Sequence, residues 1–203
     1  MTIMTAMTDS PRQRLRDTIV DAARARTIAA GWDAVRMGGV ATAAGVSRQT
    51  VYNEFGSKGG LAEALARREV DRFVGDVRAA LLAHGADVRA GAYAAIAHTL
   101  ATAADNPLVK AILTSARGGS DELLPYLTTR AEVVLTEASG ALLDWAGDQL
   151  PGADQAALTF AADTIVRLVV SHIVLPREPI EQTATALANL AVHLFSAAVR
   201  PTP

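Results

Sequence analysis

The sequence predicts an all-α protein, with an N-terminal helix-turn-helix unit followed by a larger helical body. Hydrophobic residues make up 50% of the 203 residues, yet aromatic residues make up only 4%. Alanine, the best helix former and a poor strand former, occurs 42 times. Apolar residues recur at helical spacing along the chain, and no convincing strand pattern is present. These observations exclude sheet enzymes of the Rossmann or hydrolase kind.

Charge is distributed unevenly along the chain. The formal net charge of −2 argues against a protein covered in positive charge. Residues 1–75, however, hold 11 Lys and Arg against 8 Asp and Glu, whereas residues 76–203 hold 8 against 13. The basic N-terminal part is typical of a segment that meets a polyanion, while a solvated helix face would explain the same residues.

Several functional classes lack support in the sequence. Without cysteine there is no disulfide framework and no thiolate metal site. The four histidines form no metal-binding motif, and GxSxG, GxxxxGK[ST] and GxGxxG are missing. The first ten residues do not resemble a secretion signal, and no uncharged apolar run reaches the roughly 18 residues of a membrane span. We expect a cytoplasmic protein without catalytic activity, cofactor, metal or membrane partner.

The first helix is predicted over residues 11–30. Ser10 is a suitable N-cap, Pro11 suits the first helical position, and Gln13 lies three residues after the cap. Gly31 provides the stop. Residues 1–10 are predicted to be a disordered tail.

A helix-turn-helix pattern follows. Val40, Ala41 and Ala44 form the inner face of a short helix, and Gly45 allows the positive φ of a tight turn. Ser47 caps a second helix over about residues 48–55, whose Val51 faces inward. This spacing is typical of a helix-turn-helix unit whose second helix enters the major groove of DNA.

The run from Ala44 to Lys58, AGVSRQTVYNEFGSK, resembles the DNA-binding domain of TetR-family transcriptional regulators over about residues 11–70. The resemblance implies a homodimeric, ligand-responsive repressor that binds a pseudo-palindromic operator and leaves it when a small effector binds the helical body. The first domain would cover residues 11–58 and the second residues 59–203. The predicted DNA-binding residues are Arg36, Ser47, Arg48, Gln49, Thr50, Tyr52, Asn53 and Lys58. Two alternatives to a DNA contact remain open: Tyr52 packs on the first helix, and Lys58 is an ordinary solvated charge.

The chain departs from the family pattern at three places. Gly38 offers no side chain to DNA, and two glycines at 38 and 39 weaken the short helix by roughly 1 kcal/mol each. Gly59 and Gly60 replace a more usual acidic residue, which is expected to loosen the start of the next helix. Glu54 would repel a phosphate, so we exclude it from the predicted site.

The body is predicted to contain helices over residues 61–83, from Asp87 to about residue 103, over 106–116, and from residue 120 to about 149. A last pair lies within residues 153–199. Its apolar residues repeat at four- and three-residue spacing, which is typical of a seam against another helix. We interpret the pair as the dimer interface, although two core helices of a monomer would show the same pattern. The predicted interface residues are Ile165, Leu168, His172, Leu175, Ile180, Ala184, Leu187, Ala191, Leu194 and Ala198.

The body also offers candidates for an effector pocket. Large or polar side chains among alanines are Tyr93, His98, Tyr126, Arg130, Trp145, Phe160 and Arg167. For each, core packing or a surface ion pair is an alternative. The excess of aliphatic side chains favours an apolar effector. A helical protein-interaction adaptor without sequence-specific DNA binding is the alternative function.

Overall fold

The computed structural model describes residues 10–106, 108 and 124–199, with only the backbone given for 124–134. Its secondary structure is helical throughout this part, which confirms the predicted fold class. The chain forms two compact units, which we call the N-terminal unit (described residues 10–67) and the C-terminal unit (from residue 68). The division falls inside one long helix, between Arg67 and Arg68, nine residues beyond the domain boundary expected from the sequence.

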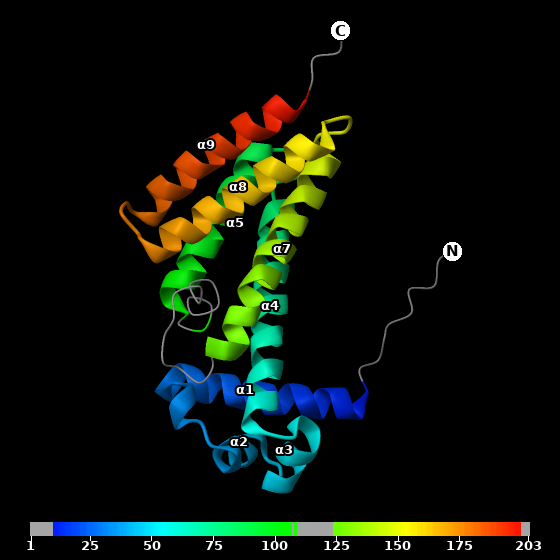
Figure 1. Cartoon of the computed structure of the whole chain (residues 1–203), viewed down its shortest axis with the longest axis vertical. Coiled ribbons are helices and arrows are strands. Elements are labelled where there is room, and N and C mark those ends of the chain that lie inside the picture. Colours follow the sequence, from blue (N-terminus) through cyan, green and yellow to red (C-terminus); the bar gives the residue numbers. More distant parts are fainter. Residues whose placement is uncertain (1–9, 107, 109–123, 200–203) are drawn as a thin grey trace, which may run out of the picture. The chain divides into compact units, whose positions relative to one another are not determined.

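The N-terminal unit contains α1 (Pro11–Ala30), a 3₁₀ turn (Trp32–Ala34), α2 (Met37–Ala44), α3 (Arg48–Phe55) and the start of α4 (Lys58–Leu82) (Figure 1). The predicted start of α1 is confirmed, because Ser10 Oγ accepts a hydrogen bond from the Gln13 backbone at 3.2 Å. Helix α1 packs on α2, and α2 on α3. The fully buried side chains of the unit include Ile19, Val35, Val40, Val51 and Leu61.

The C-terminal unit contains α5 (Val88–Asp105), α7 (Leu124–Gln149), α8 (Gln155–Val174) and α9 (Ile180–Ala198) (Figure 1). Asp87 caps α5 and Asp154 caps α8, each accepting backbone hydrogen bonds through Oδ1. Helix α9 packs against α5 and α8, and α8 also packs against α7 and α5. The helix predicted over residues 106–116 lies mostly outside the described residues.

Half of the predicted dimer seam is already covered within the single chain. Five of its ten residues are at most 7% exposed, which leaves them little surface for a second subunit: Ile165, Ala184, Leu187, Ala191 and Ala198. The four- and three-residue spacing correctly marks a face that packs on another helix, but on α9 the partners are α5 and α8 of the same chain. Of the remaining seam residues, Leu168, His172, Ile180 and Leu194 are half-buried and Leu175 is exposed.

The two glycines of α2 differ in their surroundings, although both are helical. A Cβ at Gly38 would meet no atom within 4 Å, whereas one at Gly39 would lie 2.9 Å from Arg26 Nη2. We predict that Gly38→Ala stabilises the protein by up to about 1 kcal/mol, because alanine restricts the unfolded chain and no atom has to move. A rise in the thermal unfolding midpoint by circular dichroism checks this.

Gly39→Ala serves as the matched control. Its gain in helix propensity is offset by the displacement of the Arg26 guanidinium, so its midpoint should rise less. A midpoint lowered by Gly38→Ala would contradict the prediction.

Candidate functional sites

Helices α2 and α3 form the predicted helix-turn-helix. Gly45 adopts the left-handed conformation, with φ 69° and ψ 28°, and its N–H donates to the carbonyls of the last turn of α2. Ser47 caps α3, its Oγ accepting from the Thr50 N–H at 3.0 Å. Ala41 is 3% exposed and Val51 is fully buried, as the predicted inner face requires.

The outward side chains of α3 are paired with one another. Arg48 Nη2 donates to Tyr52 Oη at 3.4 Å, and its guanidinium carbon lies 5.4 Å from the tyrosine ring centre. Gln49 Nε2 donates to Asn53 Oδ1 at 2.9 Å. Both pairs span one helical turn and leave other donors and acceptors of these side chains available. The pairs hold polar groups in defined rotamers, which lowers the entropy cost of meeting a partner.

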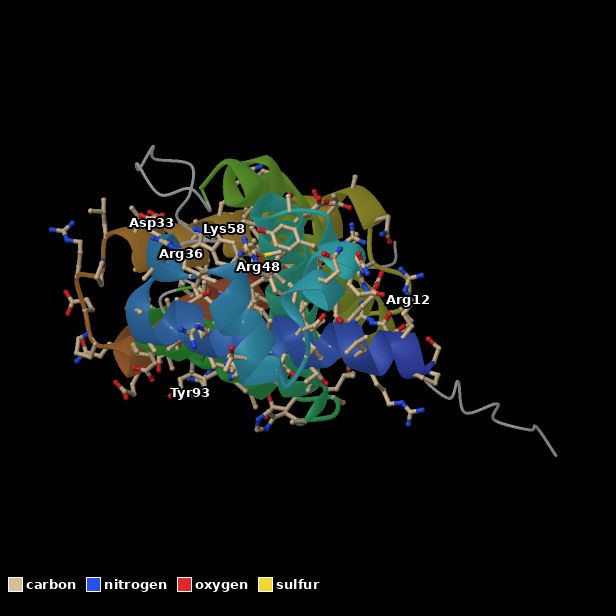
Figure 2. The ribbon with its side chains drawn as sticks, turned by 90° about the horizontal axis from the view of Figure 1, so that it is seen from below. Arg12, Asp33, Arg36, Arg48, Lys58 and Tyr93 are labelled. Atoms are coloured by element: carbon tan, nitrogen blue, oxygen red, sulfur yellow. The ribbon has the colours of Figure 1, made fainter. Side chains whose placement is uncertain are left out.

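Two further predicted residues meet the 3₁₀ turn (Figure 2). Arg36, at the N-cap of α2, donates through its guanidinium to the carbonyls of Asp33 and Val35. Lys58, the first residue of α4, has its Nζ 5.3 Å from the ring centre of Trp32, which is 2% exposed. Arg36 and Lys58 are therefore held near the N-termini of α2 and α4, where helix dipoles favour an anion.

The start of α4 is tight, not loosened as the sequence suggested. Ser57 Oγ accepts from the Gly60 N–H at 3.0 Å. A Cβ at Gly60 would lie only 2.0 Å from the carbonyl oxygen of Phe55. Glycine is thus required at this position because the end of α3 approaches the first turn of α4 so closely.

Glu54 has a role that sequence reasoning missed. Both of its carboxylate oxygens lie 3.0 Å from Arg12 Nε, and Oε2 lies 3.2 Å from Arg16 Nη1. The hydrogen bond from Arg12 lowers the pKa of Glu54 below its ordinary value of 4.5, with Arg16 acting in the same direction against partial desolvation. Glu54 therefore offsets one of the two positive charges that Arg12 and Arg16 add to the basic N-terminal part.

The C-terminal unit contains an apolar cavity between α4, α5, α7, α8 and α9, of which about 60 Å³ admits the centre of a water molecule. Among the described residues on its walls, Thr99 alone carries a hydroxyl, which donates to the Ala95 carbonyl at 2.8 Å. The walls are otherwise apolar: Phe73, Val77, Leu81, Ala92, Ala95, Ile96, Leu135, Ala138, Leu142, Ile165, Val166, Val169, Val170 and Ala191.

None of the described pocket candidates lines this cavity. Trp145 is 3% exposed and packs edge-on against Phe195, with ring centres 6.4 Å apart. Phe160 is 69% exposed, and Arg167 forms an ion pair with Asp163 at 2.7 Å. Tyr93 and His98 are half-buried on α5. The side chains of Tyr126 and Arg130 lie outside the described part. The effector-pocket candidates stay a prediction, and one of them, Arg167, lines a separate hollow between α7 and α8.

Comparison with known proteins places these two units in one family. Residues 19–65 match the family of bacterial regulatory proteins named tetR, and residues 87–193 match the C-terminal domain of the bacterial tetracyclin repressor. The chain is 35% identical over 182 residues to the HTH-type transcriptional regulator AlkX of Mycobacterium tuberculosis, which covers 90% of this chain and 85% of AlkX. The chain belongs to the TetR family. It is a TetR-family transcriptional regulator, and the family is one of regulators, not of enzymes.

Solved structures agree. The TetR family repressor AlkX from Dietzia sp. strain DQ12-45-1b, implicated in the biodegradation of n-alkanes, is 30% identical with a TM-score of 0.68, covering 90% of this chain and 98% of that one. RolR in complex with resorcinol is 20% identical with a TM-score of 0.57, covering 95% and 96%. The second likeness extends to the fold alone.

The lowered pKa of Glu54 implies that its contribution to the free energy of unfolding depends on pH. A carboxylate with a depressed folded-state pKa adds stability above its unfolded pKa, and this contribution is lost as the pH falls through the folded pKa. Glu54→Gln should therefore unfold at a lower denaturant concentration than the wild type at pH 7. The difference should shrink as the pH is lowered below 4.5. A difference in midpoint that stays constant from pH 7 to pH 3 would contradict this account.

Proposed function

We propose that this regulator is a cytoplasmic, homodimeric repressor that binds a pseudo-palindromic operator and is released by an apolar small molecule. The observation that carries the proposal is the division of chemistry between the two units. The N-terminal unit presents paired, outward polar side chains on a helix-turn-helix, and the C-terminal unit contains a cavity whose described wall residues are apolar apart from Thr99.

The DNA-binding part of the proposal rests on α3. Gln49 and Asn53, both exposed, offer the donors and acceptors that base edges require. Arg48 and Thr50 on α3, together with Ser47, Arg36 and Lys58, suit phosphates or base edges. Tyr52 holds Arg48 in place through their contact.

We predict different effects for two of these residues. Gln49→Ala should change the preferred operator sequence, because a base contact carries sequence information. Lys58→Ala should weaken binding to all sequences alike and reduce the slope of log K against log salt by about 0.9, as for one phosphate contact. Binding isotherms on a selected operator and on scrambled DNA, at several salt concentrations, measure both effects.

Asp148→Ala, at an exposed position of α7 outside the recognition unit, is the control and should change neither quantity. Binding that does not depend on salt would favour the helical protein-interaction adaptor and would contradict DNA binding.

The second subunit is proposed to cover the outward faces of α8 and α9. By length and composition α8 could even cross a membrane, yet only 33% of its apolar stretch is buried within the chain. Phe160 is 69% exposed on α8 and Leu190 is 37% exposed on α9. A helix this apolar needs cover on its outer face, and a second copy related by a two-fold axis supplies it. Such a dimer would hold two recognition helices about 34 Å apart, one turn of B-DNA.

A charged substitution on the outward face of α8 tests the proposed interface. Phe160→Glu should convert the dimer to a monomer, because it would bury an unpaired carboxylate between subunits. Light scattering after size exclusion measures the mass. Leu82→Glu, at a leucine of α4 that is 58% exposed, is the control and should leave the dimer intact. A Phe160→Glu dimer with wild-type affinity would contradict the proposed face.

The effector is proposed to bind between α4, α5, α7 and α8. Each CH₂ group buried there contributes about 0.8 kcal/mol, and the walls offer little other binding energy. The relationship to an AlkX repressor implicated in n-alkane biodegradation supports an aliphatic chain. Helix α4 runs without a break from Lys58 to Leu82, and its residues Phe73, Val77 and Leu81 line the cavity. A ligand that changes the pose of α4 would therefore also move Lys58.

We predict that 1-decanol or n-decane raises the thermal unfolding midpoint and that resorcinol does not. At ten times the Kd the stabilisation is about 1.4 kcal/mol. Ala138→Phe, which fills the cavity, should abolish the shift, whereas Ala79→Phe at an exposed position of α4 should keep it. Stabilisation by polar or cationic compounds alone would contradict an apolar effector.

A further inference from the structure

Glu54 connects the recognition helix α3 to α1 through a directional contact. Its side chain is 12% exposed, while the side chains of Arg12 and Arg16 are 70% and 34% exposed. Arg12 and Arg16 lie one turn apart on α1, so both guanidinium groups reach the same carboxylate. Charge-assisted hydrogen bonds of this kind depend strongly on geometry.

Arg16 makes this contact more than an ion pair. Its Nη1 also donates to the backbone carbonyl of Glu54, in the last turn of α3. Carbonyls there have no partner within the helix, and a cation at this end suits the helix dipole. The Arg16 guanidinium carbon further lies 4.5 Å from the ring centre of Phe55. One side chain of α1 thus holds the carboxylate, the C-terminal end and an anchor ring of α3.

The apolar anchors of α3 cannot by themselves fix its orientation. The helix has eight residues, and Val51 and Phe55 are the buried ones, lying on a single line along the helix. Apolar contacts are non-directional and resist rotation about that line only weakly. Glu54 lies about 100° around the helix from Phe55, so its contact with α1 supplies a second point away from the line.

We propose that Glu54 is a positioning residue: it fixes the rotation of α3 on α1 and thereby sets how well the protein distinguishes its operator from other DNA. The proposal rests on the DNA-binding function proposed above. Glu54 also offsets one of the two positive charges of Arg12 and Arg16, which limits the attraction to DNA of any sequence. Its role is thus to favour selectivity over affinity.

Two simpler roles make different predictions. If Glu54 only repelled phosphates, removing its charge would strengthen binding to operator and to unrelated DNA by the same factor. If it only stabilised the fold, its loss would weaken both by the same factor. In each case the ratio of the two affinities stays constant, whereas positioning requires the ratio to change.

The test compares the full-length wild type with Glu54→Gln. The operator is first selected by the wild type from random-sequence duplexes, and a scrambled duplex of equal length and composition serves as the non-specific DNA. Fluorescence anisotropy at several salt concentrations gives both affinities. We expect the affinity for scrambled DNA to rise severalfold with a steeper salt slope, because one positive charge of the Arg12–Arg16 pair is no longer offset by a carboxylate. The ratio of operator to scrambled affinity should fall about tenfold, the value of one lost base contact.

Two further variants sharpen the result. Arg12→Ala removes the most exposed member of the cluster and leaves Arg16 in place, so folding is preserved. It should lower the ratio about threefold without steepening the salt slope, since Arg16 stays paired with Glu54 and no cation is freed. Glu63→Gln is the matched control: Glu63 is 50% exposed and lies 3.9 Å from Arg67 on the same helix, α4. Its ratio should equal that of the wild type.

An unchanged ratio in both Glu54→Gln and Arg12→Ala would overturn the proposal, whatever the change in affinity. A wild type that selects no sequence from the pool would overturn the proposed DNA-binding function itself, and the positioning role with it. The two failures are distinguishable, because the first leaves a wild-type ratio well above one.

Discussion

Close packing through small side chains is the constraint on which the body of this protein depends. Ala184, Ala188 and Ala191 of α9 are fully buried, and α9 packs on α5 and α8. Gly91 extends the same principle, because a Cβ there would lie 2.8 Å from both the Leu81 carbonyl and the Trp145 ring. Helices joined in this way approach closely but fill little volume. These small side chains therefore give a tightly packed α5–α9 contact with an apolar cavity beside it. They also place much of the predicted dimer seam inside the single chain.

The N-terminal unit is built on a different principle. Its recognition helix is short, so it relies on a few specific contacts: two apolar anchors, an N-cap serine, and the Arg16 side chain bound to its C-terminal end. Each contact is directional or fully buried, which suits a helix that has to present side chains at a fixed angle. The C-terminal unit requires only that its walls be apolar, which suits a site that adapts to a flexible ligand.

The sequence predicted the fold and the helix-turn-helix well because those features are local. Ser10, Gly45, Ser47 and Asp87 act within a few residues of where they stand, and the structure confirms each of them. Features that join distant segments escaped prediction. Glu54 meets Arg12 across 42 positions of the chain, and the α9 seam meets α5. Residues that line the cavity recur at the same helical spacing as core residues. Val166 and Ala138 therefore could not be distinguished from ordinary core residues in the sequence.

In the proposed function, an apolar molecule bound in the C-terminal unit removes the protein from its operator. The most direct measurement is the anisotropy of labelled operator, saturated with protein, during titration with 1-decanol below its solubility limit. We expect the wild type to release the operator over the concentration range in which the alcohol stabilises the free protein. An operator complex that persists while calorimetry shows the alcohol to be bound would contradict it.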